Sequence, residues 1–486
     1  MSSRFAPVLL ILACCGSGDS TSPRPGAAGG RSDGDAIGAG DAMPSAADDG
    51  GPASCSFSIL ANSISPGMAT VGVVEWSTTL AAPASASIVY TLNGAASGVL
   101  NTGGTAPVDL TKANYRTLLL GLKPSSNYTF HIEVQDGSGA VCRSSDYTLP
   151  TTGVLNGVPT ATIPAISRTV FNASAQAKGF IVTSSGVTYG NYAVIIDADG
   201  TMVWFAAAPI QCTRARMDYE GANMWMVAAN EDNSGGEMRW VSMDGQTAMT
   251  NIAGLANAHH DFAVLPGKIA AMVWNGGDVD VASNLVEMSS DGSGSPTTVF
   301  AIGPNLYVGA GTTGEPSTVS YHCNSILYHP VDDTFTIGDR YPNLYVKVSE
   351  GGILQWQFGG SCANAPAGAA HCVSESWHVN HGHHLLDDGT MLVFNNNTGG
   401  PSDILEFQLN AGSPMSATSA FDFTSGSLSS TVLGDVQRLP NGNTLITYST
   451  SGEILEVDPS WAPVQSITGT YGYADWRATL YGPPPR

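Results

Sequence analysis

The chain has 486 residues, of which 12% are charged, and 18 Lys and Arg against 40 Asp and Glu give a net charge of −22 at pH 7. So large an acidic excess argues against binding to nucleic acid or to an anionic membrane surface, and any site for an anion must be a local cationic group in acidic surroundings. The length allows two or three domains, and short strands separated by Gly, Asn and Asp turns, with 57 Gly in all, predict an all-β protein.

The N-terminus carries a predicted export signal. A short apolar run ends in the letters ILAC at Cys14, which resembles the lipidation motif of bacterial lipoproteins. The run is too short to span a bilayer. We therefore predict a signal peptide over residues 1–13 with lipid on Cys14 as the only link to a membrane; an ordinary signal peptide is the alternative. Residues 14–53 are rich in Ser, Gly, Ala, Asp and Pro and are predicted to be a disordered tether. The expected location is the outer membrane, the periplasm or the cell exterior.

Residues 54–152 are predicted to form a small β-sandwich. Trp76 lies in an early strand, and Tyr128 follows a Pro-Ser-Ser-Asn turn in the way of a corner tyrosine. These features resemble a fibronectin type III domain, for which a spacer role is expected. Cys55 and Cys142, at the two ends of this segment, could form a disulfide.

Residues 153–486 contain a repeat whose units begin in a similar way. Repeat starts fall near Arg214, His260, His322, His381 and Gly434, roughly 46 to 62 residues apart, and each is followed by short strands joined by tight turns. Repeats of this size predict a β-propeller. Five are visible, and a sixth blade would combine residues 192–205 with the C-terminal segment 471–480. We predict six blades, with seven as the alternative.

The innermost strand of each blade lines the central channel of a propeller, so residues at repeat starts should converge at one mouth. The convergence would gather His260, His322 and His381. Asn324 is placed on the face of His322 by strand alternation, and Arg340 approaches His322 across a hairpin. For a single histidine, a turn-capping or backbone-bonding role is the simpler interpretation. Three histidines at matching positions, beside an arginine and an amide, favour a binding or catalytic site.

The chemistry of this set suits an oxyanion such as a phosphoryl or sulfuryl group. A zinc site built on His381 and His383 is the alternative, but Arg340 would repel a cation, so we predict neither metal nor cofactor. His259 is expected to face away from His260, and His383 to share the face of His381. Cys323 is expected to point into the packing.

The remaining cysteines allow two further predictions. Cys362 and Cys372 flank a small loop that a disulfide would close, whereas Cys212 and Cys323 are expected to be free and buried.

Three stretches of the sequence resemble the bacterial arylsulfate sulfotransferases over roughly residues 155–486. They are His322-Cys323-Asn324-Ser325-Ile326 continuing through Asp332-Asp333 to Arg340 and residues 351–360; His260-Asp261-Phe262 with Leu265-Pro266; and His381 followed by Asp388-Gly389 and Phe394-Asn395-Asn396.

This resemblance implies a six-bladed propeller that moves a sulfuryl group from a phenolic sulfate ester to a phenol through a sulfohistidine, without a nucleotide sulfate donor. The family's nucleophile corresponds to His381, its supporting histidines to His260 and His322, its arginine to Arg340 and its asparagine to Asn324. Its cysteine pair before the nucleophile corresponds to Cys362 and Cys372.

The chain departs from the family pattern at Gly382, where an Asp or a small polar residue is usual, and the family's late threonine has only Thr444 or Thr447 as candidates. The alternative function is therefore a non-catalytic cell-surface propeller of lectin or adhesin type. The expected partners of the enzyme are small phenols and aryl sulfates, with no nucleic acid.

Overall fold

The computed structural model describes residues 55–153, 166–185, 191–208, 211–229, 236–274, 283–302, 321–362 and 371–485. The predicted signal peptide and tether lie outside these residues. No helix in the described ranges is long and apolar enough to cross a membrane.

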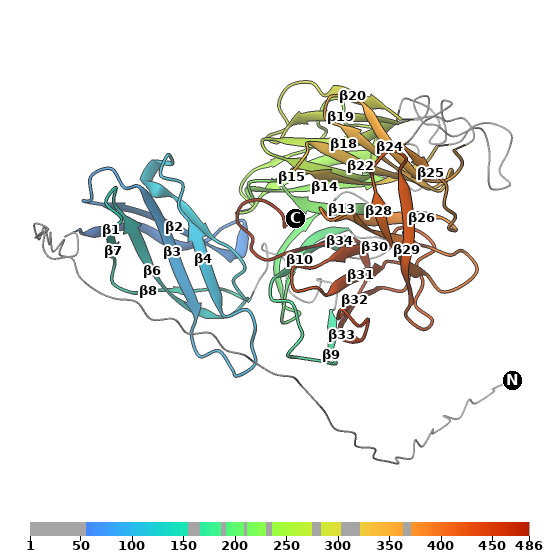
Figure 1. The fold of residues 1–486 in the computed structure, drawn as a ribbon. Helices are drawn as coiled ribbons and strands as arrows, with labels where there is room; N and C mark the ends of the chain where they lie inside the picture. The colour runs from blue at the N-terminus through green and yellow to red at the C-terminus, as the bar shows by residue number, and fades with distance from the viewer. Residues whose placement is uncertain are drawn as a thin grey trace, which may run out of the picture. The chain divides into compact units, whose positions relative to one another are not determined.

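Two antiparallel sheets form the N-terminal part of the described chain (Figure 1). One consists of β1 (Phe57–Ser65), β2 (Met68–Thr78) and β5 (Thr117–Leu119). The other consists of β4 (Gly103–Pro107), β3 (Ser85–Leu92), β6 (Asn127–Gln135) and β7 (Val141–Arg143), with β8 (Tyr147–Pro150) on β6; a short 3-10 helix, η1, spans Ala113–Tyr115.

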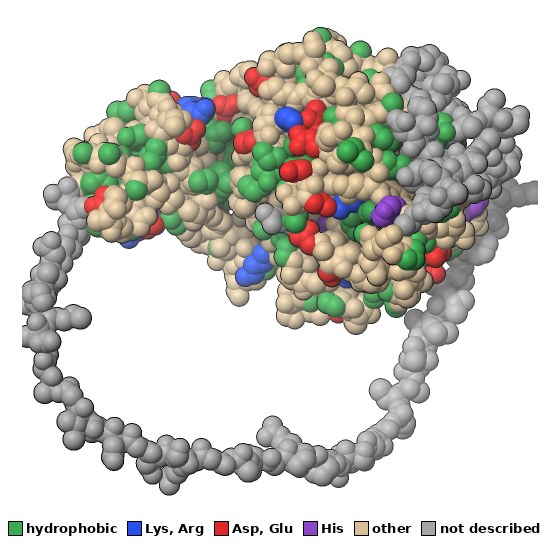
Figure 2. All heavy atoms as spheres, turned by 45° about the horizontal axis from the view of Figure 1, so that its top comes forward, with side chains coloured by type: hydrophobic (Ala, Val, Ile, Leu, Met, Phe, Trp, Pro, Cys, Tyr) green, Lys and Arg blue, Asp and Glu red, His purple; other side chains and the backbone are tan. Residues whose placement is uncertain are grey.

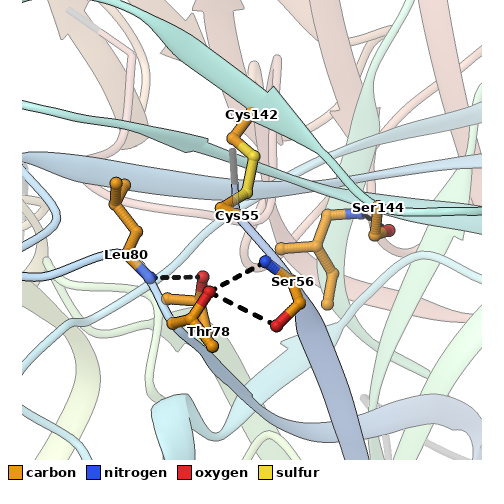
Figure 3. The surroundings of a disulfide bond; sticks show 8 residues. Cys55, Ser56, Thr78, Leu80, Cys142 and Ser144 are labelled. Atoms are coloured by element: carbon orange, nitrogen blue, oxygen red, sulfur yellow. Dashed lines mark hydrogen bonds between the residues drawn. A yellow bond between two sulfur atoms is a disulfide. The ribbon is translucent and has the colours of Figure 1, made fainter. Parts of the chain in front are cut away.

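Alternation along these strands builds the core between the two sheets. Along β6 every second residue is buried, from Tyr128 to Val134, and these side chains pack with Trp76. The Tyr128 hydroxyl accepts a hydrogen bond from the backbone N–H of Lys123 at 2.8 Å, which is the contact a corner tyrosine makes. The fibronectin type III identity of the sandwich stays a prediction. A disulfide joins Cys55 to Cys142 in β7 (Figure 3).

Six further sheets, within the described ranges, form a six-bladed propeller (Figure 1). Their innermost strands follow one another around a ring, because each contacts the next. In the following lists the strands of each blade run from the inside outwards. The first two blades consist of β34 (Tyr471–Arg477), β10 (Phe180–Ser185), β11 (Tyr192–Asp197) and β12 (Met202–Ala207), and of β13 (Cys212–Met217), β14 (Asn223–Ala229), β15 (Gly236–Ser242) and β16 (Ala248–Met249). The next two consist of β17 (Ala258–Leu265), β18 (Lys268–Trp274), β19 (Ser283–Ser289) and β20 (Thr297–Ala301), and of β21 (Cys323–His329), β22 (Thr334–Asp339), β23 (Leu344–Ser349), β24 (Leu354–Gly359) and β25 (Cys372–Val373). The last two consist of β26 (Asn380–Leu385), β27 (Thr390–Asn395), β28 (Asp403–Asn410) and β29 (Ser416–Thr424), and of β30 (Asp435–Arg438), β31 (Thr444–Tyr448), β32 (Glu453–Val457), β33 (Pro463–Thr468) and β9 (Ser167–Val170).

The ring closes through the C-terminal strand. β34 pairs antiparallel with β10, with Trp476 opposite Ile181, and so forms one blade with β10, β11 and β12. The predicted blade count and the predicted mixed blade are both confirmed. Because blades cover each other's faces, middle strands such as β27 are apolar on both faces: residues 391–394, Met-Leu-Val-Phe, are all buried.

The cysteines of the propeller follow the sequence prediction. A disulfide joins Cys362 to Cys372, where the short strand β25 adds parallel to β24. Cys212 and Cys323 are free and buried, and Cys323 packs in the apolar cluster between two blades.

Candidate active site

The three predicted histidines lie at the same end of three successive inner strands. His260 is in β17, His322 directly precedes β21, and His381 is the second residue of β26. All three are buried, with exposed fractions of 7%, 3% and 1%. The repeat pattern therefore identified one end of the channel correctly.

Bulges, and not simple alternation, aim the polar side chains at this end. The pairing register breaks between Ala258 and Phe262, between Cys323 and Ser325, and between Asn380 and His383. An extra residue in one strand re-aims its side chain, and such bulges are common beside active sites. His260 itself has a φ of 56°, the left-handed region that β-strand residues rarely adopt.

His260 and His322 form a pair. Their Nε2 atoms lie 3.1 Å apart and their rings meet edge to face, with centroids 4.7 Å apart. Contrary to the sequence prediction, His259 does not face away, because its Nδ1 lies 2.9 Å from Nδ1 of His260. The bulge and the positive φ of His260 turn both rings to the same side. His259 is also stacked on Trp274, with centroids 4.0 Å apart.

His381 has a fixed hydrogen-bonding partner that the sequence prediction missed. Its Nδ1 lies 2.6 Å from Oδ1 of Asn396. The amide of Asn396 is oriented by two other bonds, since its Nδ2 donates to the carbonyls of Ser430 and Leu433 at 2.6 and 2.8 Å. Oδ1 is therefore an acceptor, His381 must carry its proton on Nδ1, and the lone pair of the neutral ring is on Nε2.

Arg340 supplies the cationic group. Its backbone N–H donates to the carbonyl of His322 at 3.1 Å, which fixes it beside the histidines. Within the described ranges its Nε has no hydrogen-bond partner and its guanidinium forms no ion pair with a carboxylate. A buried donor that is left unpaired is costly, so this group is suited to receive an anion.

Asn324 is positioned differently from the other predicted residues. It is fully buried, and its Nδ2 donates to the carbonyl of Asn380 at 2.6 Å, directly before His381. Only one amide N–H is then left for a ligand. Ser325 and Tyr345 donate to the carbonyl of His381 at 3.0 and 3.1 Å. Together these bonds fix the backbone on which His381 lies.

The electrostatics of the site favour neutral imidazoles. Burial lowers the pKa of His260 well below its usual value, and the neighbouring His322 lowers it further. Burial also lowers the pKa of His381, with Arg340 adding to the effect, whereas the bond to Asn396 opposes it. His260 and His381 are therefore uncharged near pH 7.

His383 was expected to share the face of His381, but its ring is directed elsewhere. It lies 3.0 Å from Ser325 Oγ and 2.7 Å from Thr336 Oγ1, and it stands against Tyr345. With His384 it lines a cavity of about 480 Å³ formed by the far ends of the inner strands. It belongs to the opposite mouth of the channel.

A charged network connects inner strands across the channel. The guanidinium of Arg214, 1% exposed, donates to Asp261 at 2.8 Å and to Asp435 at 2.7 Å, and it lies 4.5 Å above the ring of Tyr473. Burial raises the pKa of Asp435 to about 6, against the opposing effect of Arg214. The sequence had identified Arg214 as a repeat start, but no pattern indicated that it would bridge three blades.

Lys and Arg are few on the face shown in Figure 2, where acidic side chains are more frequent, in keeping with the net charge of −22. In the described ranges, no three His, Cys, Asp or Glu side chains are arranged to hold a metal ion.

Residues 304–467 match the family model "Arylsulfotransferase (ASST)". The resemblance to this family is therefore confirmed over the part of the chain that contains His322, Arg340, His381 and Asn396. No curated protein matches the sequence.

Several solved structures are similar at low identity. A Lactobacillus plantarum protein is 12% identical, with a TM-score of 0.40 over 60% of this chain and 83% of that one. A streptogramin B lyase is 13% identical, with a TM-score of 0.35 over 62% and 86%. The virginiamycin B lyase of Staphylococcus aureus is 11% identical, with a TM-score of 0.35 over 62% and 88%. The propeller assignment is based on the six sheets themselves.

Proposed function

We propose that the protein is an aryl sulfotransferase that moves a sulfuryl group from a phenolic sulfate ester to a phenol through a sulfohistidine at His381. The observation that carries this function is the bond between His381 Nδ1 and Asn396 Oδ1. It leaves Nε2 as the free nucleophilic atom, close enough to Arg340 for the guanidinium to lower the pKa of the ring.

In the first half-reaction, His381 Nε2 attacks sulfur. The N–S bond forms, the S–O bond to the donor breaks, and its electron pair goes to the departing phenolate oxygen. Arg340 compensates the charge on the sulfuryl oxygens. The ring of His381 becomes positive as its Nε2 is sulfated, and Asn396 Oδ1, which accepts the Nδ1 proton, stabilises that charge.

The His260–His322 pair acts as the general acid and then as the general base. In its protonated form the pair gives a proton to the departing phenolate and becomes neutral. The neutral pair then takes a proton from the acceptor phenol as that oxygen attacks sulfur and the electron pair of the N–S bond returns to His381. Donor and acceptor occupy the site in turn, as a ping-pong reaction requires. A phenolate is a good leaving group, so no nucleotide sulfate donor is needed.

The departure at Gly382 has a structural reason. A Cβ on this residue would lie 2.1 Å from Oδ1 and 2.6 Å from Cα of Asp435 in the next blade. The residue after the nucleophile must therefore be glycine for the two inner strands to approach, and its identity does not count against turnover.

The compartment follows from the two disulfides, which persist in oxidising surroundings outside the cytosol. We propose in addition that Cys14 carries a lipid anchor, as the sequence motif indicates.

The test is to incubate the protein with 4-nitrophenyl sulfate in the absence of an acceptor. We expect one sulfuryl group on the peptide that contains His381, labile to acid, and its transfer to an added phenol. His381→Ala should abolish both results, whereas His378→Ala, which removes an exposed histidine of the same blade, should leave them unchanged. An adduct on His260 or His322 would refute the assignment of the nucleophile. A folded, oxidised protein that gives neither adduct nor phenol exchange would instead support the non-catalytic propeller.

A further inference from the structure

The far ends of the six inner strands enclose a cavity that the proposed reaction does not use. Its volume is about 480 Å³, and each of β34, β13, β17, β21, β26 and β30 contributes at least one residue to its wall. A volume of this size is typical of pockets that bind small molecules. His260, His322 and His381 do not line it. This distal cavity is therefore separate from the site of sulfuryl transfer.

The wall of the distal cavity is mainly apolar. It includes the aromatic side chains of Tyr219, Tyr328 and Trp476 and aliphatic side chains such as those of Leu327 and Leu385. The two tyrosines and the two leucines are only half-buried, so part of their surface is left for a ligand to cover. Burial of that apolar surface favours binding, and an aromatic ring also attracts a cation placed over its face.

Three arginines line the distal cavity, but little of their charge is accessible from it. The side chains of Arg214 and Arg216 are 2% and 8% exposed. Arg477 is 2% exposed, and its guanidinium donates to the carbonyls of Thr479 and Gly482 in the C-terminal segment. None of the three guanidinium groups therefore presents an open cationic surface to a ligand.

The carboxylate of Asp475 is the most accessible charged group among the inner-strand side chains of this wall. Its side chain is 20% exposed, and it accepts hydrogen bonds from Arg216 at 2.7 and 3.1 Å. Burial by itself would raise the pKa of Asp475, but Arg214 and Arg216 outweigh it and hold the pKa below its usual range. The group is therefore ionised at pH 7, and its remaining lone pairs can accept from a ligand.

The rim of the distal cavity adds negative charge. Asp387 and Asp388 both line it and are exposed. Two histidines of the wall do not offset them, because burial lowers the pKa of His329 to about 3 and that of His384 to about 4, which leaves both rings neutral at pH 7. Among the described residues, no exposed Lys or Arg lines the cavity. The electrostatics of this space therefore favour a cation over an anion.

We propose that the distal cavity is a second ligand site, which binds a small arylalkyl amine. The ammonium group bonds to the carboxylate of Asp475, and the aryl body packs against Tyr219, Tyr328 and Trp476. The site lies at the opposite end of the inner strands from His381, so a ligand there and a sulfate ester at the histidines do not compete for the same residues.

The experiment measures the binding of three probes that share one body by isothermal titration calorimetry. The probes are 4-phenylbutylamine, 4-phenylbutan-1-ol and 4-phenylbutyrate, which are cationic, neutral and anionic at pH 7. We expect the amine to bind about 10-fold more tightly than the alcohol, an effect between those of an exposed and a buried charge pair. The carboxylate should bind more weakly than the alcohol, because it would lie against Asp475 and the acidic rim.

Matched variants locate the amine. Asp475→Asn keeps an oxygen that can accept from Arg216 but removes the charge, so it should weaken the amine about 10-fold and the alcohol by less than about twofold. If this variant does not fold, the exposed pair Asp387→Asn and Asp388→Asn decides, with an expected loss of about two- to threefold for the amine alone. Asp291→Asn, which neutralises an exposed carboxylate outside the cavity, should change neither affinity.

The test also separates the distal cavity from the histidines. His381→Ala should leave the affinity for the amine unchanged, and loss of amine binding in this variant would place the ligand at the proposed active site and overturn the second site. Absence of amine binding to the folded protein, equal affinity for amine and carboxylate, or an amine affinity that neither set of carboxylate variants lowers would also overturn it. A protein that binds the amine but transfers no sulfuryl group would keep this site while the proposed function falls.

Discussion

Replacement of Asn396 by alanine tests whether the tautomer of His381 is set by the bond that the structure shows. The change removes the 2.6 Å bond to Nδ1 and leaves the proton free to occupy either nitrogen. It also removes the charge-stabilising oxygen when the ring becomes positive. Loss of one such oriented group costs about 3 to 4 kcal/mol in the transition state, so we expect the kcat to fall by roughly 10²- to 10³-fold.

The pH dependence of activity separates the loss of the Asn396 bond from a change in the protonation state of His381. Burial and Arg340 hold the pKa of His381 well below its usual value, and the bond to Asn396 is the opposing influence. Removal of Asn396 therefore lowers the pKa further and leaves the ring neutral at pH 7. Raising the pH should not restore activity, because the neutral form is already populated.

The assay is the rate of adduct formation with 4-nitrophenyl sulfate between pH 6 and 9. The carbonyl of Leu433 also loses its side-chain donor, at a cost of about 1 to 3 kcal/mol in the free energy of unfolding, whereas the carbonyl of Ser430 keeps the hydroxyl of Ser402 at 3.3 Å. Denaturation must therefore be measured beside the kinetics. An Asn396→Ala protein that is folded and retains activity within threefold, or that recovers at high pH, would refute the reasoning.

Three other predictions concern stability and location. Gly382→Ala forces a Cβ against the backbone of Asp435 and should lower the free energy of unfolding by about 1 to 3 kcal/mol, measured by chemical denaturation; an unchanged midpoint would contradict the close approach. Burial lowers the pKa of His384 to about 4, so the unfolded chain takes up its proton below about pH 6.5 while the folded protein does not. The stability due to the neutral His384 ring is complete above that pH and is lost as the pH falls towards 4. The His384→Gln variant should therefore lose about 2 kcal/mol less free energy of unfolding than the wild type between pH 7 and 5. Equal slopes of the free energy of unfolding against pH in the two proteins would contradict this prediction. Cys14→Ser should move the protein from the membrane fraction to the soluble fraction, and an unchanged distribution would exclude the lipid anchor.

The sequence by itself determined the architecture and the end of the channel at which the histidines meet. The repeat starts at His260, His322 and His381 predicted successive blades, and the C-terminal segment was correctly assigned to the blade of β10. These features can be predicted because repeat length and strand pattern are local properties, and because the symmetry of a propeller places equivalent positions at equivalent depths.

Only the tertiary structure decided how the side chains at that end are used. Strand alternation predicted that His259 would face away from His260, but a bulge, whose position depends on pairing with β18, brings the two into hydrogen-bond contact. The tautomer of His381 depends on Asn396, which is itself oriented by two carbonyls more than thirty residues further along the chain. Hydrogen-bond direction is set by all the neighbours of a group in three dimensions, and no periodicity in the sequence records it.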